Sequence, residues 1–198
     1  MCNDNVRKGY NKVAENYLKG RDQFKNDKYL ERLIKLLPKG SLILDIGCGA
    51  GIPIDSFLVD KGFKVKGIDI SEKQIELARK NVPQADFVLK DMSLLKDNEY
   101  KVDVVISFYA IFHTPREKHL DLLKKFKSFL KDDGLLLVTM GSSDWVGTEK
   151  DFFGGEMSWS HYDANSNKEL IKKAGFKIIF EEIDTSGNEK HLVVLAKK

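Results

Sequence analysis

The sequence has little of what would indicate a disulfide-rich, metal-binding or strongly charged protein. It contains 2 cysteines and 4 prolines in 198 residues, and its 33 Lys and Arg residues nearly balance its 30 Asp and Glu residues. Cys2 and Cys48 are too few for a disulfide framework or a four-thiolate zinc site, and such sparse use of cysteine is typical of a reducing compartment. A formal charge of +3 creates no strong field, so composition alone does not favour nucleic acid as a partner.

Long apolar runs are missing as well. The longest nearly apolar run covers residues 104–112 and is interrupted by Ser107, well short of the roughly 20 residues that span a bilayer. The N-terminal segment contains no apolar core of the kind that a signal peptide needs. No repeat, low-complexity stretch or linker divides the chain, and its length suits one domain. These absences predict a single soluble, cytoplasmic domain over residues 1–198, with no membrane partner.

The pattern of apolar residues predicts helices and strands in alternation. Residues 1–37 carry apolar side chains three or four apart, which predicts an N-terminal helical cover of two helices broken near Gly20. Strand-like runs rich in Val, Ile and Leu follow, and they lack a period of two, as do parallel strands that helices cover on both faces. We expect a doubly wound α/β sheet. Its strands would lie at 42–46, 64–69, 86–89, 103–108 and 135–140, and its helices at 51–61, 71–81 and 116–130.

The end of the chain departs from this alternation. Two strand-like runs, 176–183 and 191–196, are separated by only about seven residues, whereas a parallel crossover needs a dozen or more. We therefore expect an antiparallel C-terminal hairpin. The preceding connection, residues 141–163, is long for a compact domain and holds both tryptophans, so it predicts a lid or substrate loop.

A glycine-rich turn follows the first strand, in the segment Asp45-Ile-Gly-Cys-Gly-Ala-Gly51. Glycines in such a turn let the backbone approach a ligand closely and aim its amide groups at it. The spacing is not that of a dinucleotide fingerprint, because Ile52 stands where the third glycine would be, and Asp45 would repel a pyrophosphate. The turn therefore disfavours a nicotinamide oxidoreductase and favours a ligand that is cationic or zwitterionic at this end.

Two further aspartates stand at the ends of the next two strands. Asp69 lies 20 residues after Gly49, where a carboxylate can accept hydrogen bonds from both ribose hydroxyls. Asp91 follows the third strand beside Met92, and this pair suits the amino group and ring face of an adenine. Each aspartate alone could simply cap the next helix. Three aspartates at successive strand ends, on the rim where open α/β sheets bind ligands, favour a binding site.

Together these motifs resemble those of the class I S-adenosylmethionine-dependent methyltransferases. The glycine turn, the acidic end of the second strand, Asp91-Met92 and Ser107-Phe-Tyr-Ala110 occur in that family's order and spacing, from about residue 10 to the C-terminus. The resemblance implies a Rossmann-like methyltransferase fold, with a seven-stranded, mostly parallel sheet whose last strand is antiparallel. It also implies S-adenosylmethionine as the cofactor and S-adenosylhomocysteine as its product.

The resemblance further implies a set of cofactor-binding residues. Tyr10 and Tyr17 resemble an N-terminal Tyr-x(6)-Tyr helix whose hydroxyls can reach the cofactor carboxylate, although the same spacing fits an amphipathic helix that packs on the sheet. Cys48 would pack under the cofactor as a small residue and not act as a nucleophile. The remaining members would be Asp45, Gly47, Gly49, Ser107 and Phe108 toward the methionine end, Asp69 at the ribose, and Ile70, Asp91 and Met92 at the adenine.

The segments after the fourth and fifth strands bear on the methyl acceptor. Neither an Asn/Asp-Pro-Pro-Tyr-like motif nor a Pro-Cys dipeptide is present, so nucleic acid is disfavoured as the acceptor. The aromatic segment beyond residue 141 suits a small organic acceptor, with Trp145, Trp159 and Tyr162 as candidates to bind it. The candidates for a general base are His113, His161 and Tyr109, each of which could instead have only a packing role.

The sequence therefore predicts methyl transfer from S-adenosylmethionine to a small-molecule acceptor by in-line displacement. The spacings of histidine and acidic residues are not those of metal ligands, so we expect no metal. A non-catalytic regulatory or partner subunit that binds S-adenosylmethionine is an open alternative, because no residue is identified as the base. The sequence does not indicate the acceptor, the atom that is methylated or the oligomeric state.

Overall fold

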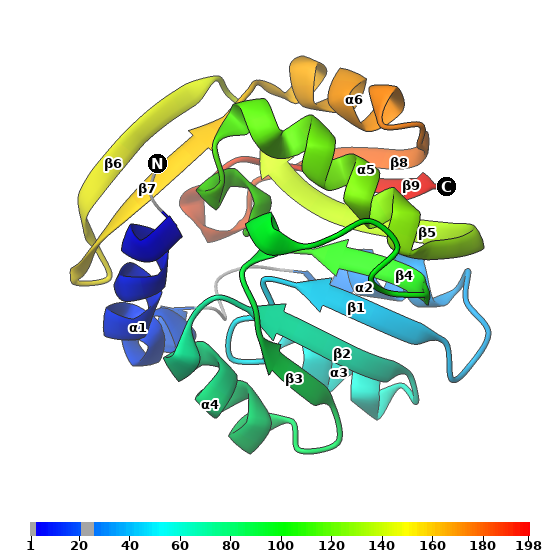
Figure 1. Ribbon diagram of the computed structural model, residues 1–198, viewed down its shortest axis with the longest axis horizontal. Coiled ribbons are helices and arrows are strands. Elements are labelled where there is room, and N and C mark those ends of the chain that lie inside the picture. The colour runs from blue at the N-terminus through cyan, green and yellow to red at the C-terminus, as the bar shows by residue number, and fades with distance from the viewer. Residues whose placement is uncertain (1–2, 21–25) are drawn as a thin grey trace.

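The computed structural model describes residues 3–20 and 26–198, and Figure 1 shows their arrangement. Its centre is a seven-stranded sheet in the order β3-β2-β1-β4-β5-β9-β8. The first five of these strands pair in parallel, while β9 pairs antiparallel with both β5 and β8, which confirms the predicted sheet and C-terminal hairpin. The strands are β1 (Leu42–Ile46), β2 (Lys64–Asp69), β3 (Asp86–Leu89), β4 (Val102–Ser107), β5 (Leu130–Gly141), β8 (Lys177–Asp184) and β9 (His191–Lys197).

Helices cover both faces of the sheet. One core packs beneath α2 and α3 and another beneath α5 and α6, while α4 packs against β2 and β3. In β1, Leu44 joins the α5–α6 core while its neighbour Ile43 joins the α2–α3 core, which is why the strands show no period of two. No helix in the described part of the chain is long and apolar enough to cross a membrane. The helices are α2 (Asp27–Ile34), α3 (Ile54–Asp60), α4 (Glu72–Asn81), α5 (His119–Phe129) and α6 (Ala164–Lys173).

The N-terminal helix α1 (Asn3–Gly20) packs between α4 and a second, smaller sheet (Figure 1). The side chain of Asn11 ties it to the start of α4, because its Oδ1 accepts hydrogen bonds from Ser71 Oγ at 2.6 Å and from Lys73 N at 3.1 Å. Arg7 adds an ion pair with Glu72. The predicted helical cover thus corresponds to α1 and α2.

The segment predicted as a lid or substrate loop, residues 141–163, is mostly a β-hairpin. β6 (Trp145–Phe152) and β7 (Gly155–His161) pair antiparallel and form the smaller sheet. Phe153 and Gly154 join them with φ angles of 52° and 90°, the left-handed conformation of a tight hairpin turn. Glycines and aromatic residues crowd this segment, so its strands lack the clear alternation that would have marked them.

Helix α6 follows the hairpin and was not predicted from the sequence. Asp163 is its N-cap, and its Oδ1 accepts hydrogen bonds from Asn165 N at 2.9 Å and Ser166 N at 3.1 Å. An aspartate directly before a helix-compatible run is a start signal that sequence reasoning could have used.

Candidate functional site

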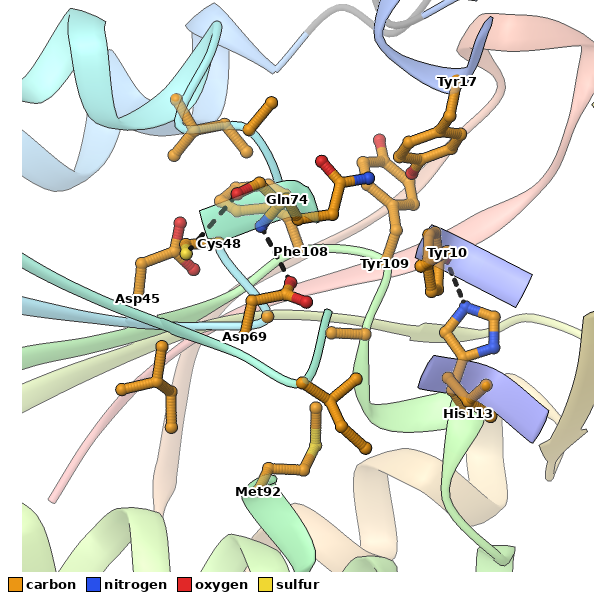
Figure 2. A pocket seen from close by; sticks show the side chains of 18 of the residues that line it. Tyr10, Tyr17, Asp45, Cys48, Asp69, Gln74, Met92, Phe108, Tyr109 and His113 are labelled. Carbon is orange, nitrogen blue, oxygen red and sulfur yellow. Dashed lines mark hydrogen bonds between the residues drawn. The ribbon is translucent and has the colours of Figure 1, made fainter. Parts of the chain in front are cut away.

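A cavity opens at the carboxyl ends of β1, β2 and β4, where open α/β sheets bind their ligands. The helix α1 supplies part of its wall. Figure 2 shows Asp45 and Asp69 toward one end, and Tyr10, Tyr17 and His113 at the other. The cavity therefore runs from the glycine turn to the N-terminal helix.

The glycine turn forms one wall of this cavity. Gly47 has a φ of 84°, and a Cβ atom there would lie 2.3 Å from the Cβ of Ala110. Gly49 has a φ of 55°, and a Cβ atom there would meet only Oε1 of Gln74, at 3.9 Å. Glycine adopts such left-handed backbone without steric cost. The turn thus presents bare backbone to the cavity, as a close ligand contact requires.

Replacing Gly47 by alanine should destabilise the protein by about 2–4 kcal/mol, because the new methyl group adds a clash with Ala110 to the strain of a left-handed backbone. Equilibrium unfolding in urea measures this loss. Gly40→Ala is the matched control, since Gly40 has a φ of 77° and no atom within 4 Å of an added Cβ. The control variant should lose about 1–2 kcal/mol of unfolding free energy. Equal losses in the two variants would contradict the close approach of the turn to Ala110.

Asp69 ends β2, and its carboxylate ties the glycine turn to the next helix. Oδ2 accepts a hydrogen bond from Gly49 N at 3.0 Å, and Oδ1 accepts one from Ser71 N at 2.8 Å. Burial raises the pKa of Asp69 to about 6, although these N–H donors oppose the shift. The side chain thus braces the start of α4 and also lines the cavity, and its contact with a ribose stays a prediction.

The predicted adenine-binding residues Ile70, Asp91 and Met92 line the cavity at the ends of β2 and β3. Asp91 is also the N-cap of the short 3-10 helix η2 (Met92–Leu94), where its Oδ1 accepts a hydrogen bond from Ser93 N at 2.8 Å. The capping role that the sequence left open is therefore present. The same side chain borders the cavity, so capping and ligand contact are compatible.

Asp45 of β1 and Asp55 of α3 form a buried carboxyl pair beneath the glycine turn. Asp55 is fully buried, and burial together with Asp45 raises its pKa well above the usual range. A carboxyl that stays protonated can donate to its neighbour, so the two groups can share one proton. Burial and the neighbouring carboxyls also raise the pKa of the Cys48 thiol. A protonated thiol is a poor nucleophile, in agreement with the packing role expected of Cys48.

The segment after β4 reaches the cavity only in part. Phe108 lines the cavity, as predicted. Ser107 does not, contrary to the prediction, because its side chain is fully buried and its Oγ donates a hydrogen bond to Ile46 O at 2.8 Å. The hydroxyl of Ser107 thus ties β4 to β1 in place of contacting a ligand.

Gln74, in the first turn of α4, lines the cavity and was not predicted. Its side chain is 1% exposed, yet neither Nε2 nor Oε1 has a hydrogen-bond partner among the described residues (Figure 2). An unpartnered buried carboxamide costs free energy unless a ligand satisfies it. The cavity therefore offers a donor and an acceptor next to Gly49. In the sequence, Gln74 could have been identified as a cavity residue by its position about one helical turn after Asp69, the acidic residue that ends β2.

Tyr10, Tyr17, Tyr109 and His113 line both this cavity and a second one. The rings of Tyr10 and Tyr17 meet edge to face with centroids 5.5 Å apart, and Tyr10 Oη lies 2.7 Å from Nε2 of His113. The two tyrosines therefore pack against each other and line both cavities, and their contact with a cofactor carboxylate stays a prediction.

Tyr109, a predicted base candidate, is anchored at both ends. It has a φ of 55°, its backbone N–H donates to Thr139 Oγ1 at 2.5 Å, and its hydroxyl donates to Asn26 Oδ1 at 2.9 Å. A left-handed tyrosine persists only where its surroundings hold it. These contacts give Tyr109 a structural role in the wall between the two cavities.

The second cavity lies between α1, the 3-10 helix η3 (Ile111–His113) and the β6–β7 hairpin. Trp145 and Trp159, predicted to bind substrate, line it together with ring centroids 5.6 Å apart. Tyr162, predicted with them, does not line it, because its ring lies against the Arg116 guanidinium at 4.7 Å. The remaining wall is half aromatic or imidazole, from Phe112, Phe152, Phe153, His161 and His191, and half small, polar or charged, from Gly141, Ser143, Glu149, Glu189 and Lys190.

The two histidines named as base candidates differ in their surroundings. His113 is buried, and this burial lowers its pKa to about 4, so that it is neutral at physiological pH. His161 borders only the second cavity, with its Nδ1 at 2.6 Å from Ser143 O. Over residues 3–20 and 26–198, no group of three or more His, Cys, Asp or Glu side chains is placed to hold a metal ion.

Known proteins resemble this chain in both sequence and fold. Residues 43–134 match a family model described as a methyltransferase domain. The chain is 30% identical over 136 residues to 2-methyl-6-phytyl-1,4-hydroquinone methyltransferase of Synechocystis, and 36% identical over 116 residues to ribosomal protein L11 methyltransferase of Dictyoglomus turgidum. These alignments cover 67% and 56% of this chain but 41% and 36% of the relatives, so the chain spans less than half of their length.

Among solved structures, the fold is similar to that of magnesium protoporphyrin IX methyltransferase of Synechocystis, determined with bound S-adenosylhomocysteine. The TM-score is 0.78 at 19% identity, over 98% of this chain and 97% of that one. At this identity the likeness establishes the fold alone. The domain model assigns residues 43–134 to a methyltransferase domain, and the strand order and the cavity at the glycine turn are those of the class I S-adenosylmethionine-dependent methyltransferase fold.

Proposed function

We propose that the protein binds S-adenosylmethionine in the first cavity and transfers its methyl group to a small organic acceptor in the second. The observation that carries this proposal is the shared wall: the ligand-facing glycine turn and an aromatic chamber meet at Tyr10, Tyr17, Tyr109 and His113. A methyl donor and an acceptor must come within contact distance, and adjoining cavities allow this.

The residues of the first cavity fit the cofactor. Asp69 would accept hydrogen bonds from the ribose hydroxyls, and Ile70, Asp91 and Met92 would border the adenine. The amide groups of the glycine turn and the unpartnered carboxamide of Gln74 supply polar contacts for the methionine end. The carboxyl pair beneath the turn places negative charge near that end, which favours an ammonium group.

When bound, the cofactor supplies a methyl group already activated by its sulfonium. The protein's main task is then to hold the acceptor in line with it, and such positioning can lower a barrier by about 7–11 kcal/mol. The second cavity suits this task, because Trp159 and Phe152 present rigid rings 5.1 Å apart between their centroids. Rigid aromatic walls favour small, flat molecules. Ser143, Glu149, Glu189 and Lys190 line the same cavity and supply polar contacts for such a molecule.

The relatives do not agree on an acceptor, since their names specify a quinol and a ribosomal protein. Our choice of a small molecule rests on the aromatic side chains that α1, η3 and the hairpin contribute to this partly open cavity. The cytoplasmic location likewise stays a prediction from the sequence.

A methyl-transfer screen tests the proposal. The full chain would be incubated with S-adenosylmethionine labelled in its methyl group and a panel of phenols, hydroxyquinolines and aromatic amines, with a ribosomal protein fraction and total RNA as competing acceptors. We expect label in at least one aromatic small molecule. Label only in protein or RNA would contradict the small-molecule acceptor, and cofactor binding without transfer to any acceptor would favour the non-catalytic subunit.

The affinity for S-adenosylhomocysteine should depend on pH through Asp69. The ionised carboxylate accepts hydrogen bonds from the ribose, and its pKa of about 6 means that acid protonates it within the accessible range. Affinity should therefore rise with pH through this pKa, and at pH 5, one unit below it, should be about tenfold weaker than at pH 7. Calorimetric titrations at the two pH values measure the ratio. The Asp69→Asn variant should bind S-adenosylhomocysteine weakly at both pH values. If its affinity still changed tenfold between them, the pH dependence would belong to another group.

A further inference from the structure

The face of the β6–β7 hairpin that lines the second cavity is built around Gly147. Trp145, Gly147 and Glu149 alternate along β6 and therefore point to this same face, and Gly147 lies opposite Trp159 of β7. A Cβ atom on Gly147 would lie 2.8 Å from the Trp145 ring. The absence of a side chain at Gly147 therefore lets the Trp145 ring lie across it toward Trp159.

Three rings with different orientations surround this part of the cavity. The Trp145 and Trp159 rings are inclined at 31° with centroids 5.6 Å apart, and the Phe152 ring stands at 80° to that of Trp159 with centroids 5.1 Å apart. The face of an aromatic ring carries partial negative charge. Ring faces turned in several directions around one space are the arrangement that binds organic cations.

Carboxylates add negative charge to the same cavity. Glu149 is exposed, lines the cavity and forms no ion pair among the described residues. Glu189 also lines the cavity, with its Oε2 at 3.3 Å from Nε2 of His191. With the histidines counted as neutral, these two carboxylates against the single ammonium group of Lys190 leave the lining with a formal charge of −1. Rings and charge therefore both favour a cation.

We propose that the methyl acceptor is an uncharged nitrogen, in an aromatic heterocycle or an aryl tertiary amine, and that the second cavity holds the cation that methylation makes of it. This inference rests on the proposed function and names the acceptor class for the same site. Methylation of a hydroxyl, thiolate or carbanion gives an uncharged product. For such a product the ring faces and the Glu149 carboxylate offer no electrostatic gain.

The transfer balances in atoms and charge. The nitrogen lone pair forms the bond to the methyl carbon as the carbon–sulfur bond breaks, and the bonding electron pair stays on sulfur. Positive charge passes from sulfur to nitrogen, no proton moves, and no general base is needed. Since this charge grows on the nitrogen in the transition state, groups that favour a cation in the second cavity lower the barrier.

Calorimetric titrations with two molecules of the same shape test this inference. N-methylisoquinolinium is a cation, and 2-methylnaphthalene is its uncharged counterpart. With S-adenosylhomocysteine bound to the full chain, we expect the cation to bind at least about tenfold more tightly. Glu149→Gln should weaken binding of the cation at least about threefold and change that of 2-methylnaphthalene less than about twofold.

Two further variants separate charge recognition from damage to the hairpin. Glu156→Gln removes an exposed carboxylate of β7 that lines neither cavity, so it should change neither affinity. Trp145→Leu keeps an apolar side chain but removes a ring face, so it should weaken the cation more than 2-methylnaphthalene. Trp145 is 43% exposed, and the fold should therefore tolerate this change.

The outcomes separate the acceptor class from the proposed function. If S-adenosylhomocysteine does not bind the wild-type chain, the proposed function fails. If it binds, but the two molecules bind equally or not at all, the acceptor class is wrong while the cofactor site stands. The same conclusion follows if Glu149→Gln weakens both molecules alike.

The products of the methyl-transfer screen give a second readout. Hydroxyquinolines offer a ring nitrogen and a hydroxyl in one molecule, and we expect the label on the nitrogen. Glu149→Gln should lower kcat/KM for the labelled acceptor at least about threefold, while the Kd for S-adenosylhomocysteine changes less than about twofold. Label on an oxygen, sulfur or carbon atom of the acceptor would contradict the inference.

Discussion

Replacing Asp69 by alanine is expected to weaken the binding of S-adenosylhomocysteine at least about 100-fold. Each hydrogen bond from a ribose hydroxyl to an ionised carboxylate contributes about 1.5–3 kcal/mol, and the variant loses two of them. It also frees Gly49 N and Ser71 N, which now donate to this carboxylate and hold the glycine turn against α4. Calorimetric titration measures the loss.

Two further variants separate ligand contact from damage to the turn. Asp69→Asn keeps one of the two accepting oxygens, so it should bind more tightly than Asp69→Ala. It should lose about 1–3 kcal/mol of stability, because its amide nitrogen leaves one of the two backbone N–H groups unpaired. Asp86→Ala removes an exposed carboxylate on β3 that pairs with Lys66, and it should leave affinity unchanged. Undiminished binding by Asp69→Ala would show that the ribose assignment is wrong.

Replacing Asp55 by alanine should destabilise the fold by about 2–4 kcal/mol. Asp55 is fully buried and held protonated beside Asp45, so its proton satisfies a carboxylate that has been taken out of water. Removing one partner leaves the other charge uncompensated and opens a small cavity, and both effects favour unfolding. Urea unfolding at neutral pH measures the change.

Asp55→Asn is the matched control, because an amide N–H can donate to Asp45 in place of the shared proton. The Asp55→Asn variant should lose less than about 1 kcal/mol of unfolding free energy. Since the folded-state pKa of Asp55 is raised, its stabilising effect is complete below the unfolded-state pKa and is lost as the pH rises through the folded-state value. The asparagine variant should lack this decline. Equal losses for the Ala and Asn variants would exclude a shared proton.

The central sheet and the cofactor wall were predictable because local sequence determines them. Buried parallel strands such as β1 are short runs of branched aliphatic residues. The glycines at 47 and 49 are needed because the local turn has positive φ angles, which glycine adopts without strain. The place of Asp69 in the cavity wall likewise follows from its position at the end of β2. These features can therefore be recognised in a single sequence without knowledge of the tertiary contacts.

The parts that could not be predicted depend on contacts between distant segments. The β6–β7 hairpin pairs residues whose strand character is masked by glycines, and its inner face is buried against α1 and η3. Ser107 follows the motif expected of a ligand contact, but a hydrogen bond to Ile46 O turns its hydroxyl into the sheet. The approach of Tyr10 to His113, 103 residues apart in the chain, is visible only in the folded protein.

The most direct measurement is a crystal structure of the protein grown with S-adenosylhomocysteine. We expect the ribose hydroxyls within hydrogen-bond distance of Asp69, the Gln74 carboxamide paired with the ligand, and the sulfur facing the wall formed by Tyr10 and His113. A ligand bound elsewhere, or one whose sulfur faces away from the aromatic chamber, would contradict methyl transfer between the two cavities.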